Sequence, residues 1–76
     1  MADEEDTVRV ELAFDGGQIM SAFVTAAGAD ALERALAAGA EGTHALDASD
    51  GRYSVVLRRV VYLKRFARES RVGFGL

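Results

Sequence analysis

The chain contains no cysteine, no proline and no tryptophan, and it has a single histidine, His44. Without cysteine, neither a disulfide nor a thiolate metal site can brace the fold. One histidine also cannot form a His-His or His-Cys metal cluster. Small domains that lack such cross-links often gain stability by association. The absence of proline leaves any edge strand free to pair with another chain.

Long hydrophobic runs are also missing, since no apolar stretch approaches the roughly 18 residues of a membrane-spanning helix. Residues 1–6 carry four acids, whereas a signal peptide begins with basic residues. We therefore expect a cytoplasmic protein without membrane contact. Residues 1–6 are expected to form a disordered acidic tail, and residues 7–76 a single domain.

The charges are distributed unevenly along the 76 residues. Residues 1–50 hold eleven acids and two bases, residues 51–76 hold seven bases and one acid, and the net charge is −3. Such asymmetry is a hint of contact with nucleic acid or a membrane. The alternative is that the two halves neutralise each other within or between chains. A net negative charge opposes DNA at long range, which favours the alternative.

The first half of the chain predicts a hairpin. In residues 7–14, apolar side chains alternate with the others at a period of two, which indicates a strand with one buried face. Asp15-Gly16-Gly17 is a typical tight turn. Residues 18–24 return as a second strand with apolar side chains on both faces. That pattern indicates a central strand, or one that a partner covers.

From Ala26 the apolar period changes to that of a helix, with Leu32, Ala35 and Leu36 on one face. Thr25 is the expected N-cap, Gly28 is the competing choice, and Gly39 is the expected C-terminal stop. The helix is rich in alanine and slim. We expect it to lie across one face of a sheet.

Residues 43–48 and 52–57 are predicted strands around a turn at residues 49–51, with Tyr53, Val55 and Leu57 on one side. The Arg58-Arg59 doublet then interrupts the pattern, as a bulge or a sharp bend would, and residues 60–63 resume it. The prediction is an α+β fold, a small antiparallel or mixed sheet in β-β-α-β-β order. One helix packs on one face, and the last strand is whole or split in two.

The segments GRYSVVLRRVVYLKRF and RVGFG resemble a family of small single-domain actinobacterial proteins of unknown function. The matching residues are Asp47, Gly51, Arg52, Val60, Val61, Tyr62, Arg71, Val72, Gly73, Phe74 and Gly75. The resemblance implies two strands, a helix, a hairpin and a C-terminal Arg-Val-Gly-Phe-Gly tail. It implies no chemistry.

Sites for catalysis are not recognisable in the sequence. No serine stands in a G-x-S-x-G context, and the glycines form no phosphate-binding loop. His44 is expected to be a surface or edge residue. We therefore expect no enzymatic activity, no metal and no cofactor.

The basic C-terminal segment is the candidate interaction site. If it coils as a helix, Lys64, Arg65, Arg68 and Arg71 share a face, with Tyr62 and Phe66 inward. Bases interleaved with aromatics suit phosphate contact and stacking, but they equally suit a protein interface. The full set of candidates is Arg58, Arg59, Tyr62, Lys64, Arg65, Phe66, Arg68, Arg71 and Phe74.

Our leading hypothesis is a non-enzymatic interaction module that self-associates through its C-terminal strand and basic, aromatic tail. A homo-oligomer is expected, with a dimer favoured, and another protein partner is a variant of this hypothesis. The acidic first half of a second copy supplies the counter-surface. The alternative is a nucleic-acid-binding module that uses the same basic segment.

Overall fold

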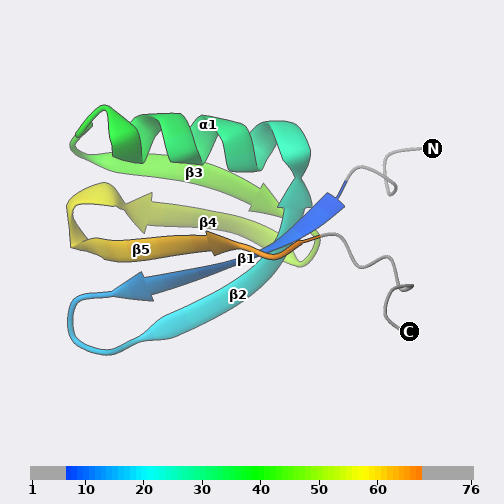
Figure 1. Ribbon diagram of the computed structural model, residues 1–76, viewed down its shortest axis with the longest axis horizontal. Helices are drawn as coiled ribbons and strands as arrows, with labels where there is room; N and C mark the ends of the chain where they lie inside the picture. The colour runs from blue at the N-terminus through cyan, green and yellow to red at the C-terminus, as the bar shows by residue number, and fades with distance from the viewer. Residues whose placement is uncertain (1–6, 68–76) are drawn as a thin grey trace.

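A five-stranded antiparallel sheet and one helix form the protein, in the order β-β-α-β-β-β (Figure 1). The computed structural model describes residues 7–67, and the predicted α+β fold is confirmed. The elements are β1 (Thr7–Phe14), β2 (Ile19–Thr25), α1 (Ala26–Ala37), β3 (Thr43–Ala48), β4 (Gly51–Val56), the 3₁₀ helix η2 (Leu57–Arg59) and β5 (Val60–Arg65). Across the sheet, the strands lie in the order β4-β3-β2-β1-β5. Within residues 7–67, no helix has the length and apolar character needed to cross a membrane.

The β1–β2 hairpin follows the predicted alternation. Val10 and Leu12 of β1 are buried, with 1% and 0% of their surface exposed. Gly16 and Gly17 have φ angles of 110° and 93°, a region that favours glycine, so the tight turn depends on them. β2 is the middle strand of the sheet, as its apolar composition predicts.

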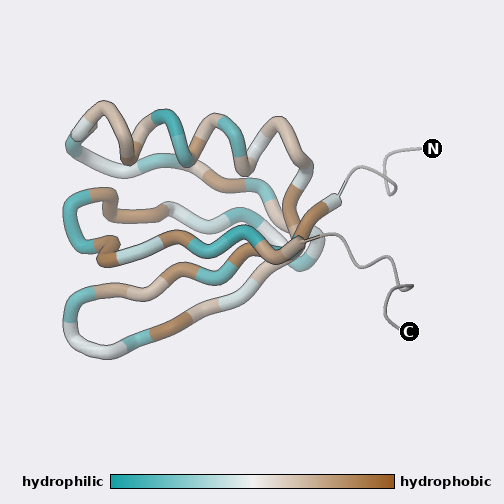
Figure 2. Tube along the Cα trace, viewed as in Figure 1, coloured by the Kyte–Doolittle hydropathy of each residue, from teal (hydrophilic) through white to brown (hydrophobic). Residues whose placement is uncertain are grey.

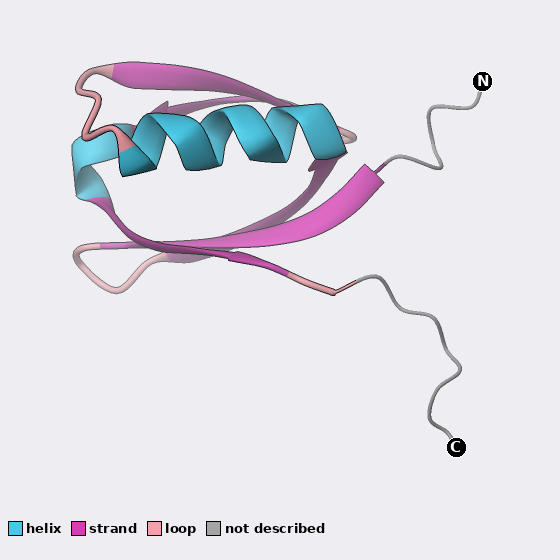
Figure 3. Ribbon diagram, turned by 45° about the horizontal axis from the view of Figure 1, so that its top comes forward, coloured by secondary structure: helices cyan, strands magenta, loops and turns pink. Residues whose placement is uncertain are grey.

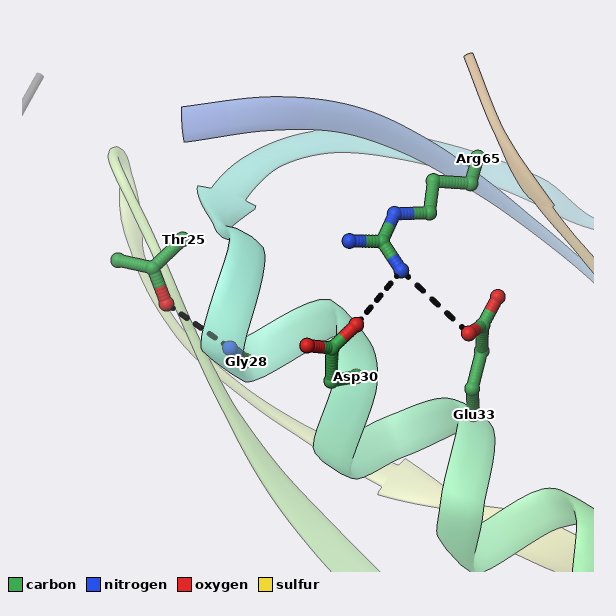
Figure 4. Close-up of polar contacts among 5 residues, drawn as sticks. All are labelled: Thr25, Gly28, Asp30, Glu33 and Arg65. Atoms are coloured by element: carbon green, nitrogen blue, oxygen red, sulfur yellow. Dashed lines mark hydrogen bonds and ion pairs between the residues drawn. The ribbon is translucent and has the colours of Figure 1, made fainter. Parts of the chain in front are cut away.

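Helix α1 begins and ends at the predicted residues. The Thr25 side-chain oxygen accepts a hydrogen bond from the Gly28 amide at 2.9 Å, so Thr25 is the N-cap (Figure 4). At the other end, Gly39 has a φ of 71°, and the Ala40 amide donates to the Ala35 carbonyl at 3.0 Å. This bond across a left-handed glycine satisfies a free carbonyl of the last turn.

The sheet is strongly curled, because η2 joins its two edge strands. In a flat five-stranded sheet, four spacings of about 4.8 Å would separate β4 from β5 by about 19 Å. A 3₁₀ helix rises only about 2 Å per residue. The four residue steps from Val56 of β4 to Val60 of β5 therefore span only about 8 Å. The sheet is opened between β2 and β3, which pair only at Val24 and Ala48. Figure 3 shows α1 in the resulting hollow, between the β3–β4 hairpin and the other three strands.

The Arg58-Arg59 doublet lies in η2, so the predicted interruption is a 3₁₀ turn that divides the last strand in two. Two backbone bonds fix this turn: the Leu57 amide donates to Gly42, and the Asp15 amide donates to Arg59, at 3.0 and 2.9 Å. A register irregularity follows in the β1–β5 pairing, between Ala13 and Phe14. The bend thus directs the chain from β4 at one edge of the sheet to β5 at the other edge.

The hydrophobic core lies between α1 and the concave face of the sheet. Figure 2 shows hydrophobic and hydrophilic positions alternating along the strands, as expected for a sheet with one covered face. Tyr53, Val55 and Leu57 point inward as predicted. The buried cluster comprises Val10, Leu12, Ala22, Val24, Ala29, Leu32, Leu46, Val55 and Leu57.

We predict that Leu57→Ala lowers the free energy of unfolding by about 2–5 kcal/mol, the usual cost of deleting a buried leucine side chain. Leu57 is 5% exposed and holds η2 in the core, although it stands in a three-residue connection. The control is Arg58→Ala, an exposed neighbour in the same turn, which should change stability by less than about 0.5 kcal/mol. Denaturant unfolding measures both, and equal effects would contradict the role assigned to Leu57.

Candidate functional site

The convex surface of β1, β2 and β5 carries three of the six candidate residues that the structure describes, Tyr62, Lys64 and Phe66. We call this surface the outer face. Its side chains point away from α1, because successive side chains of a strand alternate between the two faces. The outer face consists of Arg9, Glu11 and Ala13 of β1, Ile19, Ser21 and Phe23 of β2, Tyr62 and Lys64 of β5, and Phe66 directly after β5.

Strand register arranges these side chains in three rows. Glu11 lies opposite Ser21 and Lys64, and Ala13 lies opposite Ile19 and Tyr62. The third row has Arg9 at its centre, opposite Phe23, and the Phe66 amide donates to the Arg9 carbonyl at 3.0 Å. Each row therefore crosses three strands, with β1 in the middle.

Three large apolar side chains of the outer face are exposed to solvent. The exposed fractions are 60% for Ile19, 52% for Phe23 and 44% for Tyr62. Scattered apolar residues are normal on a protein surface, but contiguous exposed apolar groups mark interaction sites. Here β1 brings them together from two neighbouring strands, so the outer face has the composition that is typical of interaction surfaces.

Two cations flank the ring of Phe66. The guanidinium carbon of Arg9 and the Nζ atom of Lys64 each lie 4.4 Å from the ring centroid. Both distances are within the range of a cation–π interaction. The contacts hold the first residue after β5 against β1 and hold two bases over an aromatic ring.

A short hydrogen bond joins β5 to the middle strand of this surface, β1. The Tyr62 hydroxyl donates to Oε2 of Glu11 at 2.5 Å. This bond raises the pKa of Tyr62 above its ordinary value, and desolvation and the negative charge of Glu11 act in the same direction. The carboxylate of Glu11 stands in the central row, beside Lys64.

Arg65 lies on the opposite side of β5 from Lys64. It reaches α1, where its NH1 atom is 2.8 Å from Oδ1 of Asp30 and 3.4 Å from Oε1 of Glu33 (Figure 4). The hydrogen bond that Arg65 donates to Asp30 is the main reason why the pKa of Arg65 is raised. The expectation that Lys64 and Arg65 share a helical face, with Tyr62 inward, is wrong, because this segment is a strand.

The remaining candidate bases are dispersed. Arg59 forms an ion pair with Asp15 at 3.3 Å, and Arg58 is exposed in η2 beside a groove. Arg68, Arg71 and Phe74 lie outside the described residues. Residues 7–67 hold seven acids and seven bases, so this part of the chain is neutral. The basic excess of the second half does not collect on one surface of the described residues.

No site was predicted from the sequence at Arg9, Glu11, Ile19 or Phe23. The sequence did contain a signal for Ile19 and Phe23, because residues 18–24 are apolar on both faces. A single helix can cover only one face of a sheet, so the apolar side chains of the other face stay exposed. Arg9 and Glu11 gave no signal, since alternating charges are ordinary on an exposed strand. Only the pairing of β1 with β5 places them beside Tyr62 and Lys64.

Among residues 7–67, no group of three or more His, Asp or Glu side chains is placed to hold a metal ion. His44 is half-buried in β3, opposite Val55 of β4. Comparison with protein-family models, curated proteins and solved structures gives no match to this chain.

The Tyr62–Glu11 bond predicts a pH dependence. Because the pKa of Tyr62 is higher in the folded than in the unfolded chain, the bond stabilises the fold below about pH 10. That contribution is lost as the pH rises through the folded-state pKa. In a Tyr53→Phe background Tyr62 is the only tyrosine, and its titration can be followed by phenolate absorbance.

In this background, Glu11→Ala should lower the titration midpoint of Tyr62 towards about 10. The matched control is Glu33→Ala, which removes an acid that contacts Arg65 and leaves the bond of Tyr62 intact. Circular dichroism at each pH verifies that the chain is folded. Equal midpoints with and without Glu11 would contradict the assignment.

Proposed function

We propose that this chain is a non-enzymatic interaction module that self-associates through its outer face, with a dimer favoured. One observation carries the proposal: Ile19, Phe23 and Tyr62 are exposed together on one side of the sheet, beside Phe66 and its two cations. Aromatic side chains and arginine are enriched at protein interfaces and dominate their binding energy.

The energetics favour covering this surface. Full burial of a large apolar side chain contributes about 1.5–3 kcal/mol, and the outer face exposes more than one such group. A chain this short buries only about 60% of the surface that its unfolded form exposes, so a gain of that size is large relative to its own stability.

The charges make a second copy a fitting partner. The outer face holds the acid Glu11 between two bases, Arg9 and Lys64, so it carries both signs within three strands. A twofold interface brings the same surface of each copy together, and a surface with both signs can then match each base with an acid. The interface includes the C-terminal strand, through Tyr62, Lys64 and Phe66.

We predict that the wild-type chain has about twice the 8.1 kDa mass of one copy, and that Ile19→Ser with Phe23→Ser returns it to a monomer. Light scattering on a sizing column measures the mass. The control is Val56→Ser, which changes an apolar residue that is 40% exposed on β4, outside the outer face. Circular dichroism verifies that each variant is folded, and a monomeric wild-type chain at high concentration would refute the proposal.

A second function, binding of single-stranded nucleic acid, is favoured by one observation. Phe23, Tyr62 and Phe66 stand on an open sheet face with Arg9 and Lys64, and bases stack on aromatic side chains beside cations. The neutrality of residues 7–67 weighs against it, because phosphate contacts dominate such affinity. Self-association therefore ranks first.

Salt dependence separates the two functions. We expect only weak binding to an oligonucleotide at physiological salt, and no effect of the oligonucleotide on particle mass. Nucleic-acid binding would instead be tight at low salt, and each phosphate contact on a single strand would contribute about 0.7 to the slope of log K against log salt. Submicromolar binding that Lys64→Glu with Phe66→Ala abolishes would promote the second function over the first.

A further inference from the structure

A groove of about 550 Å³ lies between α1, η2 and the start of β5, and Tyr62 is the one outer-face residue that also lines it. Its apolar lining comes from Leu36 of α1, Leu57 of η2 and Val60 and Leu63 of β5. These side chains pack against the core without filling the space beside β5. Glu33, Glu41 and Arg58 also line the groove, so it is an extension of the core with apolar and charged walls that opens at the edge of the sheet.

The edge of β5 beside this groove has unpaired backbone groups. Among the described strands, β5 pairs only with β1 and is last in the order. In antiparallel pairs, the residues that exchange hydrogen bonds alternate, and the Phe66 amide donates to Arg9. Lys64 and Tyr62 therefore also bond towards β1. The amides and carbonyls of Leu63 and Arg65 face the open edge.

The sequence beyond Ala67 matches this edge in length and pattern. Residues 71–76 number six, like the six residues of β5. Val72, Phe74 and Leu76 alternate with Gly73 and Gly75, so in a strand the three apolar side chains share one face. In a strand, the segment would thus have one apolar face and another face on which Arg71 is the only side chain.

We propose that residues 71–76 of the same chain pair with β5 as a sixth strand and fill the groove. A four-residue loop at residues 67–70, a common hairpin length, places residue 71 opposite Phe66. Phe74 then lies opposite Leu63, on the groove side, and Val72 lies opposite Arg65. Gly73 and Gly75 lie opposite Lys64 and Tyr62, where they leave the outer face open.

This sixth strand explains how the edge is protected. An unpaired edge strand is a template for aggregation, and this chain has no proline to block it. The proposal does not depend on self-association through the outer face, because Tyr62 is the one described residue that the groove and the outer face share. A second copy could also supply the segment, but a four-residue loop is long enough for the chain's own segment to reach.

Disulfide trapping tests the register. Because the chain has no native cysteine, only the two introduced cysteines can form a disulfide. Lys64→Cys with Gly73→Cys creates a pair that exchanges no hydrogen bond, with a Cα separation of about 4.5 Å that suits a disulfide. Lys64→Cys with Val72→Cys is the control, because its two side chains would lie on opposite faces. We expect the first pair to oxidise within one chain, more than about tenfold faster than the control.

Equal oxidation rates would mean that the segment is not docked in this register and would overturn the proposal. A covalent dimer on a non-reducing gel would assign the segment to a neighbouring copy and would overturn its placement on its own chain. Neither result touches the outer face, whose test is the particle mass of the Ile19 and Phe23 variant.

Amide hydrogen exchange gives an independent measurement without cysteine. The amides of Leu63 and Arg65 should be protected in the wild-type chain and should lose protection in Val72→Ser with Phe74→Ser. Tyr62 and Lys64 bond towards β1, so their amides are the internal control in every variant. Gly73→Ser with Gly75→Ser changes the other face and should preserve protection. Wild-type Leu63 and Arg65 amides that exchange freely would refute the sixth strand.

Discussion

The three-residue connection η2 is the constraint on which the rest of the structure depends. It joins the two edge strands of a five-stranded sheet, so the sheet has to curl until β4 and β5 approach each other at that end. Curling opens the β2–β3 pairing, which remains only at Val24 and Ala48, and creates the hollow that α1 occupies. Leu57 anchors the connection in the core. A chain of this size thereby buries a core with one slim helix, because the sheet wraps around it.

The same curl determines which apolar side chains remain exposed. A curled sheet has only one concave face, and α1 covers it, so apolar side chains on the convex face remain in water. At the β5 edge, the inward-pointing Arg65 is paired with Asp30 and Glu33, and such an inward charge is one way in which proteins discourage edge pairing. The pairing covers only the end of β5 nearest the start of α1. The apolar groove lies at its other end, beside Leu36 and Leu57.

Local features of this fold could be read from the sequence, whereas its long-range pairing could not. The Thr25 cap, the Gly39 stop and the period-two strands depend on neighbours within a few residues, and each lies where it was predicted. The position of β5 beside β1 depends on a pairing between residues about fifty apart, for which a single sequence gives no local signal. This pairing also decides that Lys64 and Arg65 point to opposite sides, so the helical arrangement expected for them failed.

The geometry changes how the uneven distribution of charge along the chain is interpreted. Arg59 and Arg65 are bound to acids of the first half, so the asymmetry between the halves is in part neutralised within one chain. Exposed ion pairs of this kind contribute little to stability. What the pairing leaves for a partner is chiefly aromatic and aliphatic surface, with Lys64 and Arg9 over a ring. A surface of that composition gains most from excluding water, which another protein surface does more completely than a flexible polyanion.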